Sequence, residues 1–244
     1  MIRFITSFFG AIFTFLTLGA LIGVLAVGGV LWFYSRDLPS HESLAQYTPA
    51  TISRIYSTEG QIIDEFAHER RLYVPIEDVP AIVKQAFIAA EDQNFYTHKG
   101  YDAKGMAAAF VEAVVSRGQR VRGASTITQQ VMKNFLLGGE KTGERKIKEL
   151  ILATRIEETL SKDKILELYL NEIFLGQNSY GVAAAAQTYF NKPLHALAIE
   201  EAAVLASLPT QPSNFHPVRG REKLLERRAY VLRRMMEDGY ITRV

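Results

Sequence analysis

Residues 80–95 read PAIVKQAFIAAEDQNF, and this stretch decides the fold class. Its apolar positions share the period of an amphipathic helix, and they are Ile82, Val83, Ala86, Phe87 and Ala90. Pro80 suits the first turn of a helix, because its missing N–H would have no partner there. The pattern therefore predicts a helix that runs to about Phe95 and carries the acidic pair Glu91 and Asp92 near its end.

The same helical period continues along the rest of the chain. It predicts further helices at residues 103–116, 125–137, 144–160, 162–174, 180–189, 198–208 and 219–238. Ser161 suits an N-cap between two of these segments, and Gly239 suits a C-cap after the last. We therefore predict a mainly α fold in which residues 80–244 form one helical domain.

Residues 37–79 have a different character and are predicted to form a linker and a small β-hairpin neck. Residues 37–51 carry Pro, Ser and Thr without periodicity, as a connector does. Residues 52–56 and 61–66 are β-prone and flank a turn that contains Gly60, which predicts a hairpin. Residues 71–75 are a candidate third strand.

Residues 1–36 are predicted to form a cytoplasmic tip and a transmembrane anchor. Between Phe4 and Ser35 the only ionisable side chain is that of Tyr34, and an arginine flanks each end of the run. At about 1.5 Å per residue, such a helix exceeds the roughly 30 Å hydrocarbon core. The alternative is a cleaved signal peptide, but its apolar region spans only about 7–15 residues. The flanking charges favour a cytoplasmic N-terminus and an extracytoplasmic body.

The composition of the 244 residues excludes several classes of protein. With 48% hydrophobic and 22% charged residues, the chain is neither disordered nor a polytopic membrane protein. Its 28 basic and 26 acidic residues give a net charge of +2, so no global positive field indicates nucleic acid. The absence of cysteine excludes disulfides, thiolate metal sites and a cysteine nucleophile.

Glu91 and Asp92 begin the pattern E-D-x-x-F-x-x-H-x-G, which ends at His98 and Gly100. A carboxylate between apolar turns is partly desolvated, and desolvation raises a carboxyl pKa towards the range useful to a general base. The alternative is a solvated glutamate beside an aspartate that caps a helix end.

Residues 122–130, RGASTITQQ, place small and hydroxylated side chains at a predicted helix start. Free N–H groups and the helix dipole favour an anion at such a position. Lys133 and Asn134 lie about two turns further along. An ordinary Ser-capped amphipathic helix is the alternative interpretation.

Residues 141–148, KTGERKIK, form a local basic cluster in a nearly neutral chain, and Glu149 follows it at once. Such a cluster is either a solvated helix face or a site for a diphosphate leaving group. Further on, Tyr169 and Asn171 lie in the apolar run ELYLNEIFLG of residues 167–176. They are either core hydrogen-bond partners or supports of a site.

Residues 105–115, GMAAAFVEAVV, contain one acidic side chain, Glu112, and precede Arg117, Arg120 and Arg122. Two interpretations are open. Either this segment dips into a lipid interface while the arginines meet head groups, or it is a plain core helix.

Five segments, taken in order, resemble the motifs of the family 51 peptidoglycan glycosyltransferases over about residues 80–240. They are EDQNFYTHKG (91–100), RGASTITQQVMKN (122–134), RKIKE (145–149), ELYLNEIFLGQNSYG (167–181) and EAAVLASLP (201–209). The anchor and hairpin neck resemble the start of a class A penicillin-binding protein of the 1A type. Two expectations stay open: an N-terminal piece of such a bifunctional protein without its transpeptidase domain, or a monofunctional relative.

The resemblance implies a lysozyme-like, mainly helical glycosyltransferase domain and assigns roles to its residues. Glu91 is implied as the general base, and Glu149 as a second catalytic carboxylate that positions the reacting groups or a divalent cation, Mg²⁺ or Mn²⁺. No organic cofactor is implied. The substrate-binding residues implied are Asp92, His98, Ser125, Thr126, Gln129, Gln130, Lys133, Asn134, Lys141, Arg145, Lys146, Tyr169 and Asn171. Lys141 stands where relatives often have arginine, and Asn178 replaces a frequent glycine.

The resemblance also implies an activity and a location. The domain is expected to polymerise lipid II into β-1,4 glycan strands, with inversion and release of undecaprenyl diphosphate. The location is the extracytoplasmic side of the cytoplasmic membrane, with a single-pass anchor. The implied partners are lipid II, the growing glycan chain, membrane lipid and other cell-wall synthesis or division proteins, and no nucleic acid.

Two other functions compete with this one. A lytic glycosidase on the same fold would expel a neutral sugar and would not need the basic cluster at 141–148. A non-catalytic cell-wall scaffold would not need both Glu91 and Glu149.

Overall fold

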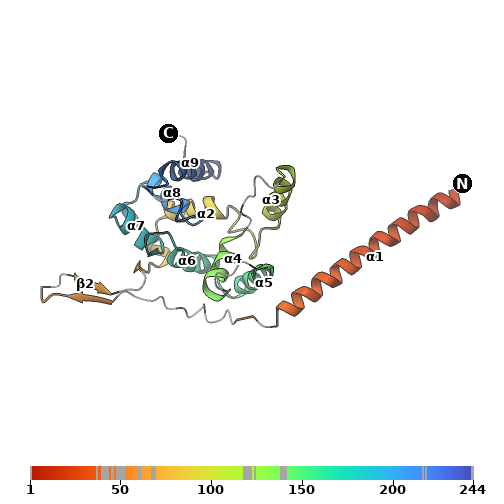
Figure 1. The fold of residues 1–244 in the computed structure, drawn as a ribbon, viewed down its shortest axis with the longest axis horizontal. Helices are drawn as coiled ribbons and strands as arrows, with labels where there is room; N and C mark the ends of the chain where they lie inside the picture. The colour runs from red at the N-terminus through yellow and green to blue at the C-terminus, as the bar shows by residue number, and fades with distance from the viewer. Residues whose placement is uncertain are drawn as a thin grey trace.

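The structure, a computed structural model, is mainly helical and confirms the predicted fold class (Figure 1). It describes residues 2–36, 38–39, 44, 47, 53–59, 62–66, 70–117, 123, 125–137, 142–215, 217 and 219–242. The α-helices are α1 (Ile2–Tyr34), α2 (Ala81–Glu91), α3 (Ala103–Val115), α4 (Ile127–Met132), α5 (Gly143–Thr159), α6 (Lys162–Glu172), α7 (Val182–Phe190), α8 (Ile199–Ser207) and α9 (Arg221–Glu237). The short helices are η2 (Ile76–Asp78), the π-helical η3 (Lys133–Leu137) and η4 (Leu194–Ala196), and the strands are β1 (Ser53–Tyr56), β2 (Ile62–Phe66), β3 (Arg70–Arg71) and β4 (Ser179–Tyr180).

Helix α1 extends away from the helical body (Figure 1). Its apolar stretch Gly10–Tyr34 is 25 residues long and is not buried by the rest of the protein. At about 1.5 Å per residue this stretch exceeds a hydrocarbon core of roughly 30 Å. The predicted apolar N-terminal helix is therefore present and is long enough to cross a membrane.

The helical body is built from two groups of helices around a shared core. Helix α2 packs on α8 and α9, while α4 packs on α5 and α6. The rings of Phe87 in α2 and Tyr169 in α6 meet edge-on, with centroids 6.1 Å apart. Both side chains are almost completely buried, so burial of large apolar surface joins the two groups.

The neck contains the predicted hairpin, in which β1 pairs with β2 in antiparallel register. The third strand differs from the prediction, because β3 leaves the hairpin and pairs in parallel with β4 of the body. The guanidinium of Arg71 stacks 5.4 Å from the ring centroid of Tyr180, which holds β3 at this position. The N–H and C=O groups of Val74 form hydrogen bonds with the side chain of Asn171. They are therefore not available to a strand partner, and the strand does not continue to residue 75.

Three predicted helix ends differ from the structure for local reasons. Helix α2 ends at Glu91 rather than Phe95, because Asp92 takes a non-helical conformation with φ −157°. Helix α4 begins at Ile127 because Thr126 is its N-cap and accepts from the Gln129 N–H at 3.2 Å. Its predicted last turn is π-helical over Lys133–Leu137. The predicted cap at Ser161 is confirmed by its hydrogen bond from the N–H of Lys164.

Two residues in the left-handed region shape loops next to the body. Gly100 has φ +85°, and a Cβ there would lie 2.5 Å from the carbonyl oxygen of Ala153 in α5. Only glycine lets the loop approach α5 this closely, and the Gly100 carbonyl then accepts from Thr126 Oγ1 at 2.7 Å. Asn178 has φ +55°, a conformation that asparagine tolerates better than most residues. Position 178 therefore keeps a glycine-like conformation without glycine.

Candidate active site

A cleft of about 1020 Å³ lies where the ends of α2, α3, α4, α5 and α9 face one another. It brings together side chains that are far apart in sequence. Ten of the predicted site residues line it: Glu91, Asp92, Ser125, Thr126, Gln129, Gln130, Lys133, Arg145, Lys146 and Glu149. The cleft therefore contains both predicted carboxylates and most of the predicted basic set.

Glu91 is the last residue of α2, and its carboxylate is held from two sides. Its Oε2 accepts a hydrogen bond from Nε2 of Gln130 at 2.9 Å. Its Oε1 accepts from Oγ1 of Thr210 at 3.3 Å and lies 3.6 Å from Nη2 of Arg227. These contacts fix the carboxylate at the cleft wall while 12% of its side chain stays accessible.

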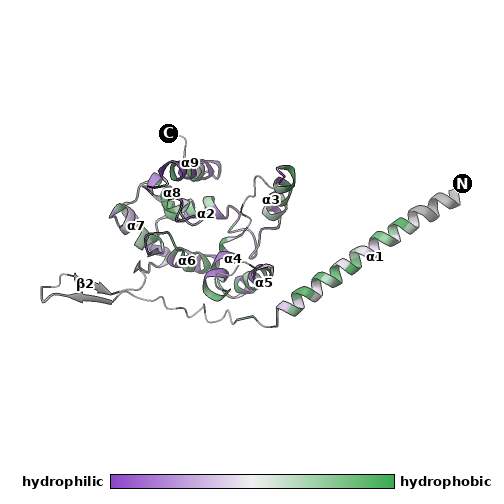
Figure 2. Cartoon of the chain, in the orientation of Figure 1, coloured by the Kyte–Doolittle hydropathy of each residue, from purple (hydrophilic) through white to green (hydrophobic). Residues whose placement is uncertain are grey.

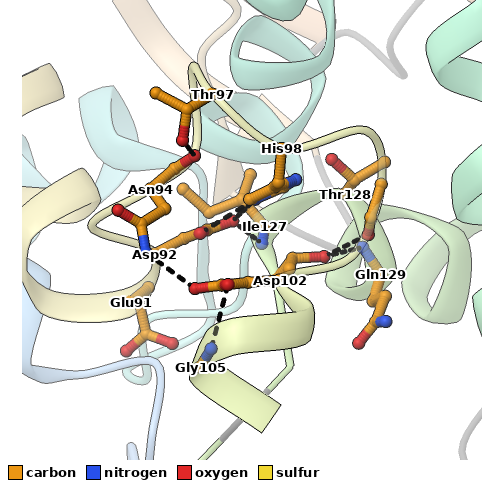
Figure 3. Close-up of polar contacts among 12 residues, drawn as sticks. Glu91, Asp92, Asn94, Thr97, His98, Asp102, Gly105, Ile127, Thr128 and Gln129 are labelled. Atoms are coloured by element: carbon orange, nitrogen blue, oxygen red, sulfur yellow. Dashed lines mark hydrogen bonds and ion pairs between the residues drawn. The ribbon is translucent and has the colours of Figure 1, made fainter. Parts of the chain in front are cut away.

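Asp92 points away from Glu91 and organises the surrounding loop (Figure 3). Its Oδ2 accepts from the Ile127 N–H at 2.9 Å, and Nε2 of His98 lies 2.9 Å from the same oxygen. An anion was expected at the start of the 125–137 helix, and the structure places the Asp92 carboxylate there. Asp92 is thus a support that joins the end of α2 to the start of α4.

Glu149 lies within α5 with only 2% of its surface exposed, and two cations neutralise it. Nε of Arg145 lies 3.2 Å from Oε1, and Nζ of Lys146 lies 2.9 Å from Oε2. The Lys146 ammonium also donates to Ser125 Oγ at 2.8 Å and to Gln129 Oε1 at 3.2 Å. Since the Lys146 side chain is 47% exposed, it offers positive charge to the cleft while Glu149 fixes its position.

Two adjacent glutamines of α4 form hydrogen bonds at Glu91 and beside Glu149. Gln130 contacts Glu91, whereas Gln129 contacts the lysine that pairs with Glu149. The spacing of the two contacts along α4 places the Glu91 carboxylate and the cation cluster at separate points of one cleft. This arrangement can accept a proton at Glu91 and bind a polyanion near Lys146.

Four predicted site residues lie outside the cleft lining, and they are His98, Asn134, Tyr169 and Asn171. His98 supports Asp92, and Asn134 is an exposed residue of η3. Asn171 bonds both backbone groups of Val74, so it fastens the neck to α6. Lys141 lies outside the described residues.

Tyr169 is a buried neighbour of the site rather than part of its surface. Only 1% of the residue is exposed, and its hydroxyl has no hydrogen-bond partner among the described residues. Desolvation, followed by the nearby charges of Glu91 and Asp92, raises the pKa of Tyr169 well above its ordinary value. The hydroxyl therefore stays neutral behind the two carboxylates.

The structure adds cleft residues that the sequence analysis did not select. Arg227, Tyr230 and Arg234 of α9 line the cleft, as do Asp102 and Thr210. Asp102 caps α3 through the Gly105 N–H and accepts from Asn94 (Figure 3). Burial acts to raise the pKa of Asp102, but these two hydrogen bonds, the nearby His98 and the Lys104 N–H together outweigh it and lower that pKa. Both arginines lie in α9, which is rich in charged residues. The sequence alone therefore does not distinguish the arginines that line the cleft from the other charged residues of this helix.

The described residues do not form a protein cage for a metal ion. No group of three His, Asp or Glu side chains suited to a metal occurs among them. Both oxygens of Glu149 already face cations. A divalent ion at Glu149 would therefore need other ligands.

Comparison with known proteins assigns the cleft to a family. The transglycosylase family matches residues 59–236, which include every described cleft residue, and the chain belongs to this family. Penicillin-binding protein 1A of Rickettsia prowazekii (strain Madrid E) is 51% identical over 225 residues, covering 91% of this chain and 29% of that protein. Penicillin-binding protein 1A of Neisseria meningitidis serogroup B (strain ATCC BAA-335 / MC58) is 47% identical over 240 residues, covering 98% and 29%.

A solved structure, penicillin-binding protein 1A from Haemophilus influenzae, is 30% identical to this chain and gives a TM-score of 0.44. The match covers 81% of this chain and 20% of that one. The chain thus spans less than a third of the length of the relatives it matches. The resemblance seen in the motifs is confirmed: the chain carries the transglycosylase domain that relatives named penicillin-binding protein 1A also contain.

Proposed function

We propose that this domain polymerises lipid II into glycan strands. The observation that carries the proposal is that one cleft holds the carboxylate of Glu91 apart from a cation cluster around Glu149. A general base and a stabilised diphosphate leaving group are the two requirements of this glycosyl transfer.

The proposed reaction forms one bond and breaks another. Glu91 takes the proton of the acceptor's 4-hydroxyl, and that oxygen attacks the anomeric carbon of the growing chain. The bond from this carbon to the diphosphate oxygen breaks, and undecaprenyl diphosphate leaves with the electron pair. Lys146, Arg145 and Lys133, which line the cleft, are suited to stabilise the charge of the leaving group.

A divalent cation, Mg²⁺ or Mn²⁺, remains a separate proposal. Magnesium is commonly held by one or two carboxylates together with the phosphates of a substrate. Glu149 could supply one such carboxylate only by giving up a contact with Arg145 or Lys146. No step of the proposed reaction depends on the ion.

The exposed face of α3 supports contact with lipid. Phe110 and Val115 are 71% and 77% exposed, and of α3, all of which is described, only Ala109 is buried. The interpretation of this segment as a plain core helix is therefore wrong. Figure 2 shows apolar residues on α3 as well as on α1. We infer that α3 rests in the membrane interface, where it would bring the cleft to a lipid-held substrate.

A single-cysteine experiment tests this contact, since the natural chain has no cysteine. An environment-sensitive fluorophore on Phe110→Cys should shift to the blue in vesicles, whereas the same label on Glu158→Cys, at an exposed site of α5, should not. Equal spectra at the two sites would contradict lipid contact by α3.

The proposed location follows from α1 and the chemistry. We propose that α1 crosses the cytoplasmic membrane once and that the domain lies on its extracytoplasmic side. Lipid II, the growing glycan chain and membrane lipid are then the proposed partners, together with other cell-wall synthesis proteins.

Product analysis separates this function from its alternatives. The purified chain is incubated with lipid II in detergent, with and without Mg²⁺, and the products are resolved by size. Glycan polymer and free undecaprenyl diphosphate support the transferase. Shortening of added glycan would favour the lytic glycosidase. No reaction by a folded chain would count against an autonomous transferase and would favour either a piece that needs the rest of a longer protein or a partner, or the scaffold.

A further inference from the structure

The segment between α1 and the neck touches the body at Tyr47, a contact that the proposed reaction does not use. The Tyr47 ring meets the ring of Phe135 edge-on, with centroids 4.8 Å apart. Its hydroxyl bonds the carboxylate of Glu172 at the end of α6 and accepts from Nη1 of Arg71 at 2.9 Å. Leu44, three residues earlier, is 3% exposed and packs into the core. Tyr47 and Leu44 are therefore held on the body by polar and apolar contacts together.

Phe135 belongs to η3, the π-helical turn Lys133–Leu137 that continues α4. The turn also carries Lys133, which lines the cleft. π-Helical turns are rare in proteins. Where they occur, they often lie at functional sites. The turn packs on α5, and Phe135, Leu136 and Leu137 lie against the core. Tyr47 adds a ring contact to this packing at Phe135.

We propose that Tyr47 is a positioning residue for the reaction: through Phe135 it fixes the π-helical turn that presents Lys133 to the diphosphate of the glycan donor. This proposal rests on the proposed function. The polar contacts fix the Tyr47 ring in turn, since Glu172 and Arg71 hold its hydroxyl on the side of α6. Tyr47 would thus help to shape the substrate site from outside the cleft.

Tyr73 provides a matched control within the neck. Its hydroxyl also donates to a glutamate of α6, Glu167, at 2.8 Å. No ring contact joins Tyr73 to η3 among the described residues. The two tyrosines therefore share the fastening to α6 and differ in the contact with Phe135.

Kinetics with lipid II distinguish positioning from general stability. An edge-to-face aromatic pair contributes enough that Tyr47→Ala should raise KM by about three- to tenfold, with kcat changed less than about threefold. Tyr47→Phe keeps the ring contact with Phe135 but loses the hydroxyl bonds, so its KM should lie between those of the natural chain and Tyr47→Ala. Tyr73→Ala should lower the melting temperature as Tyr47→Ala does but leave KM unchanged. An unchanged KM in Tyr47→Ala, or an equal rise in Tyr73→Ala, would overturn the proposal.

A second readout does not depend on activity, so failure of the proposed function remains distinguishable. The rate of acetylation by an amine-reactive ester is measured for Lys133 and Lys146 by mass spectrometry. In Tyr47→Ala, Lys133 should react at a changed rate while Lys146, held by Glu149, should not. Unchanged acetylation of Lys133 in this variant would also overturn the proposal.

Discussion

Nε2 of Gln130 donates a hydrogen bond to Oε2 of Glu91 across 2.9 Å, although the residues are 39 positions apart in sequence. The bond joins the last residue of α2 to the helix that also contacts the cation cluster. It therefore fixes the proposed base relative to the proposed leaving-group site.

Loss of this bond should impair turnover more than folding. Removing one hydrogen bond to a charged group should lower kcat of Gln130→Ala by about tenfold. Initial rates of lipid II polymerisation measure the effect, with Gln187→Ala, an exposed glutamine of α7, as the control. Equal rates in Gln130→Ala and the natural chain would show that Glu91 needs no such support.

Lys146 is the exposed cation of the cluster, and its charge is expected to act on the leaving group. Lys146→Ala should lower kcat/KM by about 100-fold, the scale of one lost transition-state contact. Lys223→Ala, which removes an exposed lysine of α9, should have little effect. Steady-state kinetics on lipid II check both. A loss confined to stability, with normal kinetics, would contradict the role of Lys146.

Asp92 is expected to act on stability. Asp92→Ala leaves the buried N–H of Ile127 without its partner, which should lower the free energy of unfolding by about 1–3 kcal/mol. Glu226→Ala, at an exposed position of α9, should change it by less than about 0.5 kcal/mol. Urea unfolding of the detergent-solubilised protein compares the two. Similar values for both variants would argue against the support role.

Glu167 should make the fastening of the neck dependent on pH. Burial acts to raise the pKa of Glu167, but hydrogen bonds from Lys164, Tyr73 and the Ile76 N–H, together with the charge of Lys164, outweigh it and lower that pKa. A carboxyl with a lowered folded-state pKa contributes stability that is present above its unfolded value, near 4.5, and is lost as the pH falls through the folded value. The melting temperature should therefore fall below about pH 4.5 less steeply in Glu167→Gln than in the natural chain. Parallel pH profiles would contradict this linkage.

Much of the fold could be predicted from the sequence, because apolar periodicity and caps are local signals. The helix at residues 80–95, the hairpin and the cap at Ser161 are examples, although the first ends four residues early. The pairing of β3 with β4 could not be predicted, since it depends on contacts of Arg71 with distant residues.

The site was predicted in part. Motif resemblance selected ten residues that line one cleft, but it also selected Asn171, whose hydrogen bonds serve the neck. It did not select Arg227, because the side of a charged helix that faces a cleft depends on tertiary packing. Local sequence patterns therefore predict the chemical type of a site residue better than the direction in which tertiary packing turns its side chain.

The role of Glu91 is the central claim, and one measurement tests it most directly. The natural chain and Glu91→Gln are incubated with lipid II, and the rate of glycan formation is measured beside Glu158→Gln as a charge-matched control. We expect Glu91→Gln to keep its melting temperature and to lose activity by at least about 100-fold, the scale of a lost general base. Glycan formation by folded Glu91→Gln at the rate of the natural chain would contradict the claim.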